Sequence, residues 1–241
     1  MEIKKEIMER INNYRTGDDY TPLMIRLGII PPIYITSPWL HLDSILSYLC
    51  LRDALGDYFY ILPTEETVDI SLLDLPLKKT DDVYHASIGV YSNARLYKDT
   101  IYKRFTDKES YKLSKKQQQG RIKINQGHFK DFMIDLPILI TDTVTFYCNG
   151  DKKEIQRLLN HLTHIGKKGS IGGGRIYDIN ITETDEDYSF YKDNKIMRPI
   201  PTNIKIPLTE GMVFQRQPYK PPYWDKNNVC MCYVPENQIK G

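Results

Sequence analysis

Cysteine is scarce in this sequence, and the spacing of the few cysteines does not predict a metal site. Four cysteines among 241 residues are too few and too scattered for a disulfide scaffold. Cys230 and Cys232 stand one residue apart, which is not the two-residue gap of common zinc knuckles, and no histidine is near them. We therefore expect no structural metal.

Long apolar runs and nucleotide-binding motifs are also lacking. No run approaches the roughly 20 apolar residues that span a bilayer, and residues 1–14 lack the apolar segment of a signal peptide. We expect a cytoplasmic protein with no membrane partner. Neither a Gly-Lys-Ser/Thr element nor a G-x-G-x-x-G fingerprint occurs, so nucleotide cofactors are set aside and no cofactor is expected.

The composition is that of a globular protein, but the charge is unevenly placed. Hydrophobic residues make up 41% and charged residues 27% of the chain, enough to bury a full core at this length. The net charge is +2, yet residues 95–130 hold eleven Lys or Arg against three acids, a local charge of 11 − 3 = +8. Such a concentration is typical of a phosphate-binding surface, although any single lysine is more often a solvated charge.

The basic segment supplies a first set of candidate RNA-binding residues. Tyr111 is one of several tyrosines that alternate with its cations, a pattern that suits stacking on unpaired bases. The candidate phosphate contacts are Arg95, Lys103, Arg104, Lys115, Lys116, Arg121 and Lys123.

A glycine-rich stretch supplies the second set. Asp151 predicts a helix over residues 151–165, with Glu154 three residues on as in a capping box, and Gly166 predicts its end. Four glycines then occupy six positions, and a strand is expected over 175–181. Dense glycines permit positive φ and leave amides free to bind anions, whereas the alternative is a flexible turn between core elements. The candidates are Lys167, Lys168, Gly169, Ser170, Gly172, Gly173, Gly174 and Arg175.

The remaining pattern predicts an elaborated split β-α-β unit of the α+β class. We expect an amino-terminal helical extension over 1–20, a ferredoxin-like domain over 21–185 with a basic subdomain inserted at about 57–130, and a carboxy-terminal strap or tail over 186–241. The elements expected within them are a helix over 2–14, a strand over 23–29, a helix that begins at Ser37-Pro38 and ends at Gly56, paired strands at 121–124 and 131–140, a strand over 144–148 that ends at Asn149-Gly150, and an edge strand or strap over 198–208. The aromatic segment 219–224 either packs on the domain or docks a neighbouring subunit.

Two motifs resemble a known family. The glycine-rich loop with basic residues, set between the last helix and the last strand, resembles the signature of the RAMP superfamily of CRISPR RNA-binding proteins. The string PWLHLDSILSYLCLRDAL, residues 38–55, resembles the first helix of the Cas-five-type subunit of type IV CRISPR effectors, which carries a His-Leu-Asp before an apolar helix. The resemblance extends in order from Leu23 to about Ile181.

This resemblance implies a ferredoxin-like, RRM-like RAMP fold with a thumb-like insertion and a carboxy-terminal extension. It implies a non-catalytic subunit that binds the 5′ handle of the CRISPR RNA and caps a filament of backbone subunits. The implied partners are the CRISPR RNA, the backbone and large subunits, and target DNA near a flanking motif.

Two other functions fit the same sequence. A metal-independent endoribonuclease would need a general base, an acid and a cation, and His41, His128, Tyr111 and Lys168 are the candidates. His41 is the candidate base, and its structural alternative is a first-turn histidine that holds the chain entering the helix. A phage or plasmid decoy of such a subunit would share every feature.

Overall fold

The computed structural model describes residues 2–62, 68–104, 130–205 and 212–236. Its centre is an antiparallel sheet with the strand order β5-β8-β1-β9. Helices α2 (Leu42–Leu55) and α4 (Lys152–Leu159) follow β1 and β8 in the chain. This is the β-α-β-β-α-β order of a ferredoxin-like unit, which confirms the predicted α+β class. The four strands are β1 (Tyr20–Ile30), β5 (Val90–Tyr91), β8 (Thr143–Asp151) and β9 (Arg175–Glu183).

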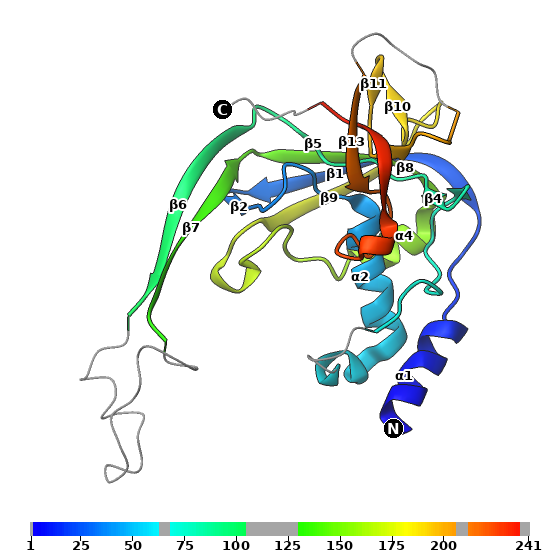
Figure 1. The fold of residues 1–241 in the computed structure, drawn as a ribbon, viewed down its shortest axis with the longest axis horizontal. Coiled ribbons are helices and arrows are strands. Elements are labelled where there is room, and N and C mark those ends of the chain that lie inside the picture. Colours follow the sequence, from blue (N-terminus) through cyan, green and yellow to red (C-terminus); the bar gives the residue numbers. More distant parts are fainter. Residues whose placement is uncertain (1, 63–67, 105–129, 206–211, 237–241) are drawn as a thin grey trace.

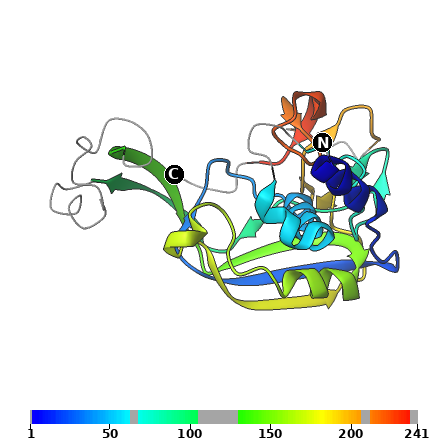
Figure 2. The same ribbon diagram turned by 90° about the horizontal axis from the view of Figure 1, so that it is seen from below.

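The core lies between one face of this sheet and the helices. Side chains alternate along β1, so Leu23, Ile25 and Leu27 are buried while Arg26 points to the other face and is exposed. The helices α1 (Glu2–Asn13) and α2 lie on the same side of the strands (Figures 1 and 2). The predicted first strand and amino-terminal helix are therefore confirmed, because their apolar residues meet across one core.

The boundaries of α2 were predicted correctly at one end only. Gly56 ends the helix with a φ of +54°, as expected of a glycine at that position. The helix begins at Leu42, not at Ser37-Pro38, and the prediction of that start was wrong. The Ser37 hydroxyl accepts from the Trp39 amide within a local turn, so its capping capacity is used before the helix begins.

Helix α4 has the predicted beginning and a different end. The Asp151 carboxylate accepts from the amides of Lys153 and Glu154, both at 3.0 Å. The helix ends at Leu159 and not at Gly166 as predicted, because the backbone of residues 163–165 pairs with the start of β9 instead. The strand before it also runs on to Asp151, beyond the predicted end at Asn149-Gly150.

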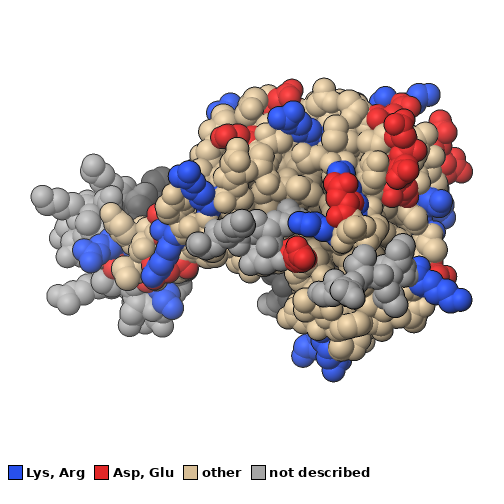
Figure 3. Space-filling model, turned by 90° about the horizontal axis from the view of Figure 1, so that it is seen from above, with Lys and Arg blue, Asp and Glu red and all other residues tan. Residues whose placement is uncertain are grey.

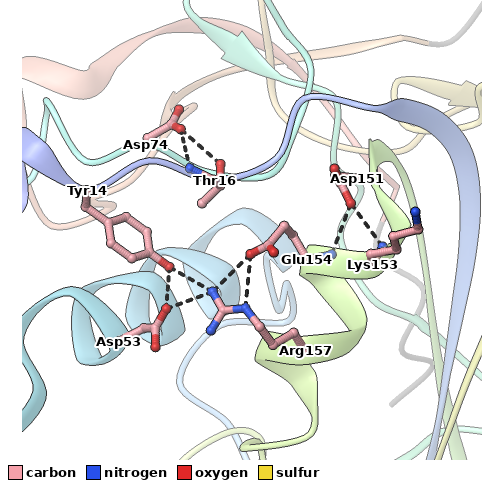
Figure 4. A network of polar contacts seen from close by, with 8 residues as sticks. All are labelled: Tyr14, Thr16, Asp53, Asp74, Asp151, Lys153, Glu154 and Arg157. Atoms are coloured by element: carbon pink, nitrogen blue, oxygen red, sulfur yellow. Dashed lines mark hydrogen bonds and ion pairs between the residues drawn. The ribbon is translucent and has the colours of Figure 1, made fainter.

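A polar cluster ties the amino-terminal helix to α2 and α4 (Figure 4). The Tyr14 hydroxyl donates to Asp53 at 2.7 Å, and Arg157 donates to the same Asp53 oxygen at 2.8 Å and to Glu154. The hydrogen bond from Arg157 lowers the pKa of Asp53, so the carboxylate stays charged. The cluster therefore fixes the end of α1 against both helices of the central unit.

A long hairpin, which we call the arm, projects from the body (Figure 1). It consists of β6 (Arg95–Lys103) and β7 (Phe132–Ile140), and β2 (Ile33–Tyr34) pairs with β7 at its base. The predicted partner of the second strand was residues 121–124, which lie outside the described residues. The described partner of β7 is β6, which pairs with it along its whole length. Residues 95–103 therefore form a regular strand within a stretch that was predicted to be irregular, and that prediction was wrong there.

The carboxy-terminal part adds short strands beside the β5 edge of the sheet (Figure 1). A three-stranded sheet has the order β12-β14-β13, so within the edge strand or strap predicted over 198–208 residues 200–201 form an edge strand, and residues 206–208 lie outside the described residues. None of the described helices is long and apolar enough to cross a membrane. The remaining elements are β3 (Lys79–Thr80), β4 (Val83–Tyr84), β10 (Tyr191–Lys192), β11 (Lys195–Ile196), β12 (Ile200–Pro201), β13 (Val213–Pro218), β14 (Val229–Val234) and the 3-10 helices η1 (Gly56–Ile61), η3 (Gly169–Ile171) and η4 (Lys226–Asn228).

A buried arginine anchors the carboxy-terminal part to the first turn of α2. Arg198 is fully buried, and its guanidinium donates to Asp43 at 3.0 Å, to the carbonyl of Ala86 at 2.9 Å, and to the carbonyls of Tyr84 and Tyr219. Burial alone would lower the pKa of Arg198, but the Asp43 carboxylate outweighs it and the pKa is raised. The guanidinium is therefore charged and paired.

Candidate nucleic-acid interface

The glycine loop, residues 166–174, has a backbone that requires glycine at several positions. Gly166, Gly172 and Gly174 have φ values of +77°, +91° and +64°, and Lys168 also lies in the left-handed region at +62°. A side chain on Gly174 would clash, because its Cβ would lie 2.0 Å from the carbonyl oxygen of Ile165. The loop is thus closely packed at Gly174, where only glycine fits.

The amides of the loop bind mainly within the protein. Gly172 donates to Gly169 at 3.0 Å, Gly173 to Lys168 at 3.1 Å, and Gly174 to Pro32 at 2.8 Å. The expectation that all the glycine amides are free for phosphates is therefore corrected. Among the described residues no acceptor is found for the amides of Gly169 and Ser170, which lie at the exposed turn of the loop.

Tyr34 joins the glycine loop to the arm. Lys167 donates its amide to the Tyr34 carbonyl at 2.8 Å, and Gly173 packs so closely on the Tyr34 ring that an added Cβ would lie 2.6 Å from it. The Tyr34 hydroxyl donates to Asp99 of β6 at 2.6 Å, and this bond raises the pKa of Tyr34. One side chain therefore holds the loop and the arm in a fixed relation.

Alternation along the arm places two candidate cations on the face that carries this contact. Arg95, Asp99 and Lys103 are separated by even numbers of residues, so they share one face of β6. Because Asp99 accepts from Tyr34, on whose ring Gly173 packs, this face of β6 is the one that Tyr34 connects to the glycine loop. Figure 1 shows the loop on the concave side of the arm, between the arm and the helices.

The distribution of charge also favours the surface formed by the glycine loop and the arm as a phosphate-binding surface. Lys167 and Arg175 are exposed and form no ion pair with a described residue, and the same holds for Arg95. Lys98, on the opposite face of the arm, is paired with Asp135 at 2.6 Å. Figure 3 shows Lys and Arg atoms along the arm and the largest group of Asp and Glu atoms of that view at the opposite end of the molecule.

The structure places most of the residues that the sequence proposed. The candidates of the glycine loop are contiguous, Arg95 and Lys103 lie on the face of β6 that Asp99 shares, and Arg104 follows β6. Sequence reasoning missed Tyr34, although the pair Ile33-Tyr34 follows Pro31-Pro32, where the first strand was expected to end, and so marks the start of a new element. The candidates Tyr111, Lys115, Lys116, Arg121 and Lys123 lie outside the described residues, as does His128.

His41, the candidate general base, packs against an aromatic ring. Its imidazole stacks on Tyr223 with ring centroids 3.9 Å apart, and Tyr223 donates its hydroxyl to Asp43 at 2.8 Å. Burial, and then the charge of Arg198, lower the pKa of His41 to about 3. The histidine therefore stays neutral and holds the chain that enters α2, which is the structural alternative.

The lowered pKa of His41 predicts that the stability of the protein depends on pH. The unfolded imidazole binds a proton near pH 6.5, whereas the folded one does so only near pH 3. Stability is thus expected to fall as the pH drops from 6.5 toward 3, by about 2 kcal/mol at pH 5 from this group. His41→Phe, which keeps a ring on Tyr223, should remove this loss in urea unfolding at pH 7 and pH 5. An equal loss in both proteins would contradict the assignment.

Comparison with known proteins identifies the family. The family model described as CRISPR type IV associated protein Csf3 matches residues 78–235, more than half of the chain. The chain belongs to the Csf3 family. The type IV resemblance is thereby confirmed at the level of the family, and the glycine loop and the arm lie within the matched residues. The His-Leu-Asp string that suggested it lies outside them.

Two further comparisons describe this Csf3-family protein. A solved chain from the cryo-EM structure of the type III-B Cmr-beta complex bound to cognate target RNA is similar over 74% of this chain, with 9% sequence identity and a TM-score of 0.39. The matched part spans 65% of that chain, less than two thirds of its length. A comparison with curated proteins found no match.

Proposed function

We propose that this Csf3-family protein is a non-catalytic RNA-binding subunit with a RAMP fold that holds the 5′ handle of the CRISPR RNA. The observation that carries the proposal is the joint surface of the glycine loop and the arm, connected through Tyr34 and Asp99. Lys167 and Arg175 stand on it without ion-pair partners among the described residues, so they are available to phosphates.

The handle is proposed to enter between the arm and the body. The amides of Gly169 and Ser170 and the cations of the loop would contact phosphates, and Tyr97 of the arm, which is 51% exposed, would stack on a base. In the assembled complex the subunit would cap the filament of backbone subunits beside the large subunit, near the target DNA. Guide pairing would then read the target sequence.

A double substitution tests the phosphate contacts. Lys167→Ala with Lys168→Ala is expected to weaken binding of single-stranded CRISPR repeat RNA and to reduce the log-log salt slope by about 1.4 units, since each lost phosphate contact on a single strand removes roughly 0.7. The control is Lys152→Ala with Lys153→Ala, an adjacent pair in the first turn of α4. Equal slopes for the two double variants would remove the loop lysines from the RNA surface.

Incubation of the protein with labelled CRISPR repeat RNA tests the endoribonuclease alternative. EDTA is present, and the products are separated on native and denaturing gels. Cleavage that leaves a 2′,3′-cyclic phosphate would make the protein an enzyme. The stacking of His41 on Tyr223 gives that histidine no role in such a reaction, so we expect a shift without cleavage.

A further inference from the structure

The second face of the central sheet is open along its middle. The helices lie on the other side of the strands (Figure 2), and the residues that point away from them on β1 and β9 include Arg26, Asn180 and Thr182, all exposed. Register confirms that they are neighbours, because Arg26 pairs with Asn180 across β1 and β9 and with Thr145 across β1 and β8. The face thus presents hydrogen-bonding side chains instead of a continuous aliphatic surface.

An aromatic ring lies on this face next to a glycine. A Cβ added to Gly28 would come within 2.6 Å of the Tyr177 ring, so the ring packs directly on the Gly28 backbone. Tyr177 is nevertheless 65% exposed, which leaves much of the residue open to solvent. A tyrosine seated on a glycine in a sheet is a platform on which a flat ligand can stack.

A second aromatic group lies further along β1, on the side of its other neighbour β8. Tyr147 pairs with Met24 of β1, and its ring meets the Tyr188 ring at a centroid distance of 5.7 Å. The Lys192 ammonium stands 5.6 Å and 5.3 Å from these two ring centroids. Met24 and Gly28 are four residues apart, which is about 13 Å at roughly 3.3 Å per residue, and Arg26 lies between them.

We propose that this open face binds unpaired bases of single-stranded RNA, with Tyr177 as the principal stacking platform. The occupant is single-stranded RNA because an exposed tyrosine ring, a central arginine and amide or hydroxyl groups match base faces, phosphates and base edges respectively. The inference rests on the proposed function and extends it. Arg175, the first residue of β9 after the glycine loop, lies two residues before Tyr177, so one strand of RNA can pass from the loop onto the sheet.

The test is the affinity of the full chain for a fluorescein-labelled single-stranded RNA of about a dozen nucleotides, a length within the range that sheet-based modules cover. Tyr177→Leu is expected to weaken binding about tenfold, as loss of one stacked base does, without changing the salt slope. Gly28→Ala, which must displace the ring, should weaken binding in the same direction. Tyr60→Leu is the control, since Tyr60 is 71% exposed in η1, after α2.

Each outcome decides a separate point. If Tyr177→Leu binds like wild type or like Tyr60→Leu while the double lysine variant is weakened, the sheet-face inference is overturned and the proposed function stands. If the wild-type chain binds no RNA, the proposed function fails and the inference fails with it. A selective loss in Tyr177→Leu and Gly28→Ala, with an unchanged salt slope, supports the sheet face.

Discussion

Replacing Arg198 with methionine is expected to lower the free energy of unfolding by about 3–5 kcal/mol, the range measured when one partner of a buried ion pair is removed. The guanidinium donates to Asp43 and to three backbone carbonyls on two separate segments, those of Tyr84 and Ala86 on one and that of Tyr219 on the other. Methionine fills a similar volume but donates nothing, so the Asp43 carboxylate would stay buried beside Tyr223 without its counter-charge. The carboxy-terminal part should loosen from α2.

Equilibrium unfolding in urea measures this change, and Arg157→Met is the matched control. Arg157 also bridges two carboxylates, Asp53 and Glu154, but its side chain is 42% exposed. An exposed ion pair contributes about 1 kcal/mol or less, so the control should lose far less stability than Arg198→Met. If the two variants were equally stable, the buried cluster would not be what attaches the carboxy-terminal part to the body.

This cluster gives a physical reason for the string that first resembled a family. His41 stacks on Tyr223 and Asp43 binds Arg198, so both polar members of His-Leu-Asp contact residues about 155 or more positions later in the chain. The contact with Tyr223 therefore explains the position of His41 without an RNA substrate. Asp43 could be found on the helix from the sequence, but its partner could not, because nothing local to residue 198 marks a buried arginine.

Local patterns predicted the elements of the central unit well where apolar and polar residues alternate or where a residue caps a helix. The alternation in β1 and the Asp151 cap act over a few residues, and both were confirmed. The errors occur where distant backbone competes with a local signal. Residues 163–165 continue an apolar helical pattern, yet they pair with β9, and β6, in a stretch predicted to be irregular, pairs with a strand almost thirty residues further on.

The residues of the candidate site could be proposed from the sequence, but their geometry could not. Glycine density drew attention to residues 169–174, whereas the acceptors of their amides, such as the carbonyls of Pro32 and Lys168, are supplied only by the folded chain. The connection between the loop and the face of β6 that carries Arg95 depends on Tyr34 and Asp99, which carry no sequence signature of their own. Tyr177 was part of a predicted strand, but its exposure depends on Gly28 in another strand.

Replacing Gly174 of the glycine loop with alanine is expected to destabilise the protein strongly. Gly174 has a φ of +64°, and its Cβ would lie 2.0 Å from the Ile165 carbonyl oxygen and 3.0 Å from the carbonyl carbon, both rigid backbone atoms. A left-handed non-glycine residue costs about 1–3 kcal/mol by itself. The clash adds to that cost, so Gly174→Ala is expected to lower the free energy of unfolding by about 3 kcal/mol or more. We expect the hydrogen bond from the Ile165 amide to the Gly174 carbonyl to break as well.

Gly172→Ala separates the two causes, because Gly172 has a φ of +91° but no atom within 4 Å of an added Cβ. Gly172→Ala should therefore lower the free energy of unfolding only by the cost of the left-handed backbone conformation, about 1–3 kcal/mol. If the loop is held against Tyr34 to bind RNA, Gly174→Ala should also weaken RNA binding at least about tenfold at a temperature where the protein is still folded, and Gly172→Ala much less. Equal RNA affinities with unequal stabilities would mean that the packing at Gly174 supports the fold alone, and that the phosphate contacts lie on the arm.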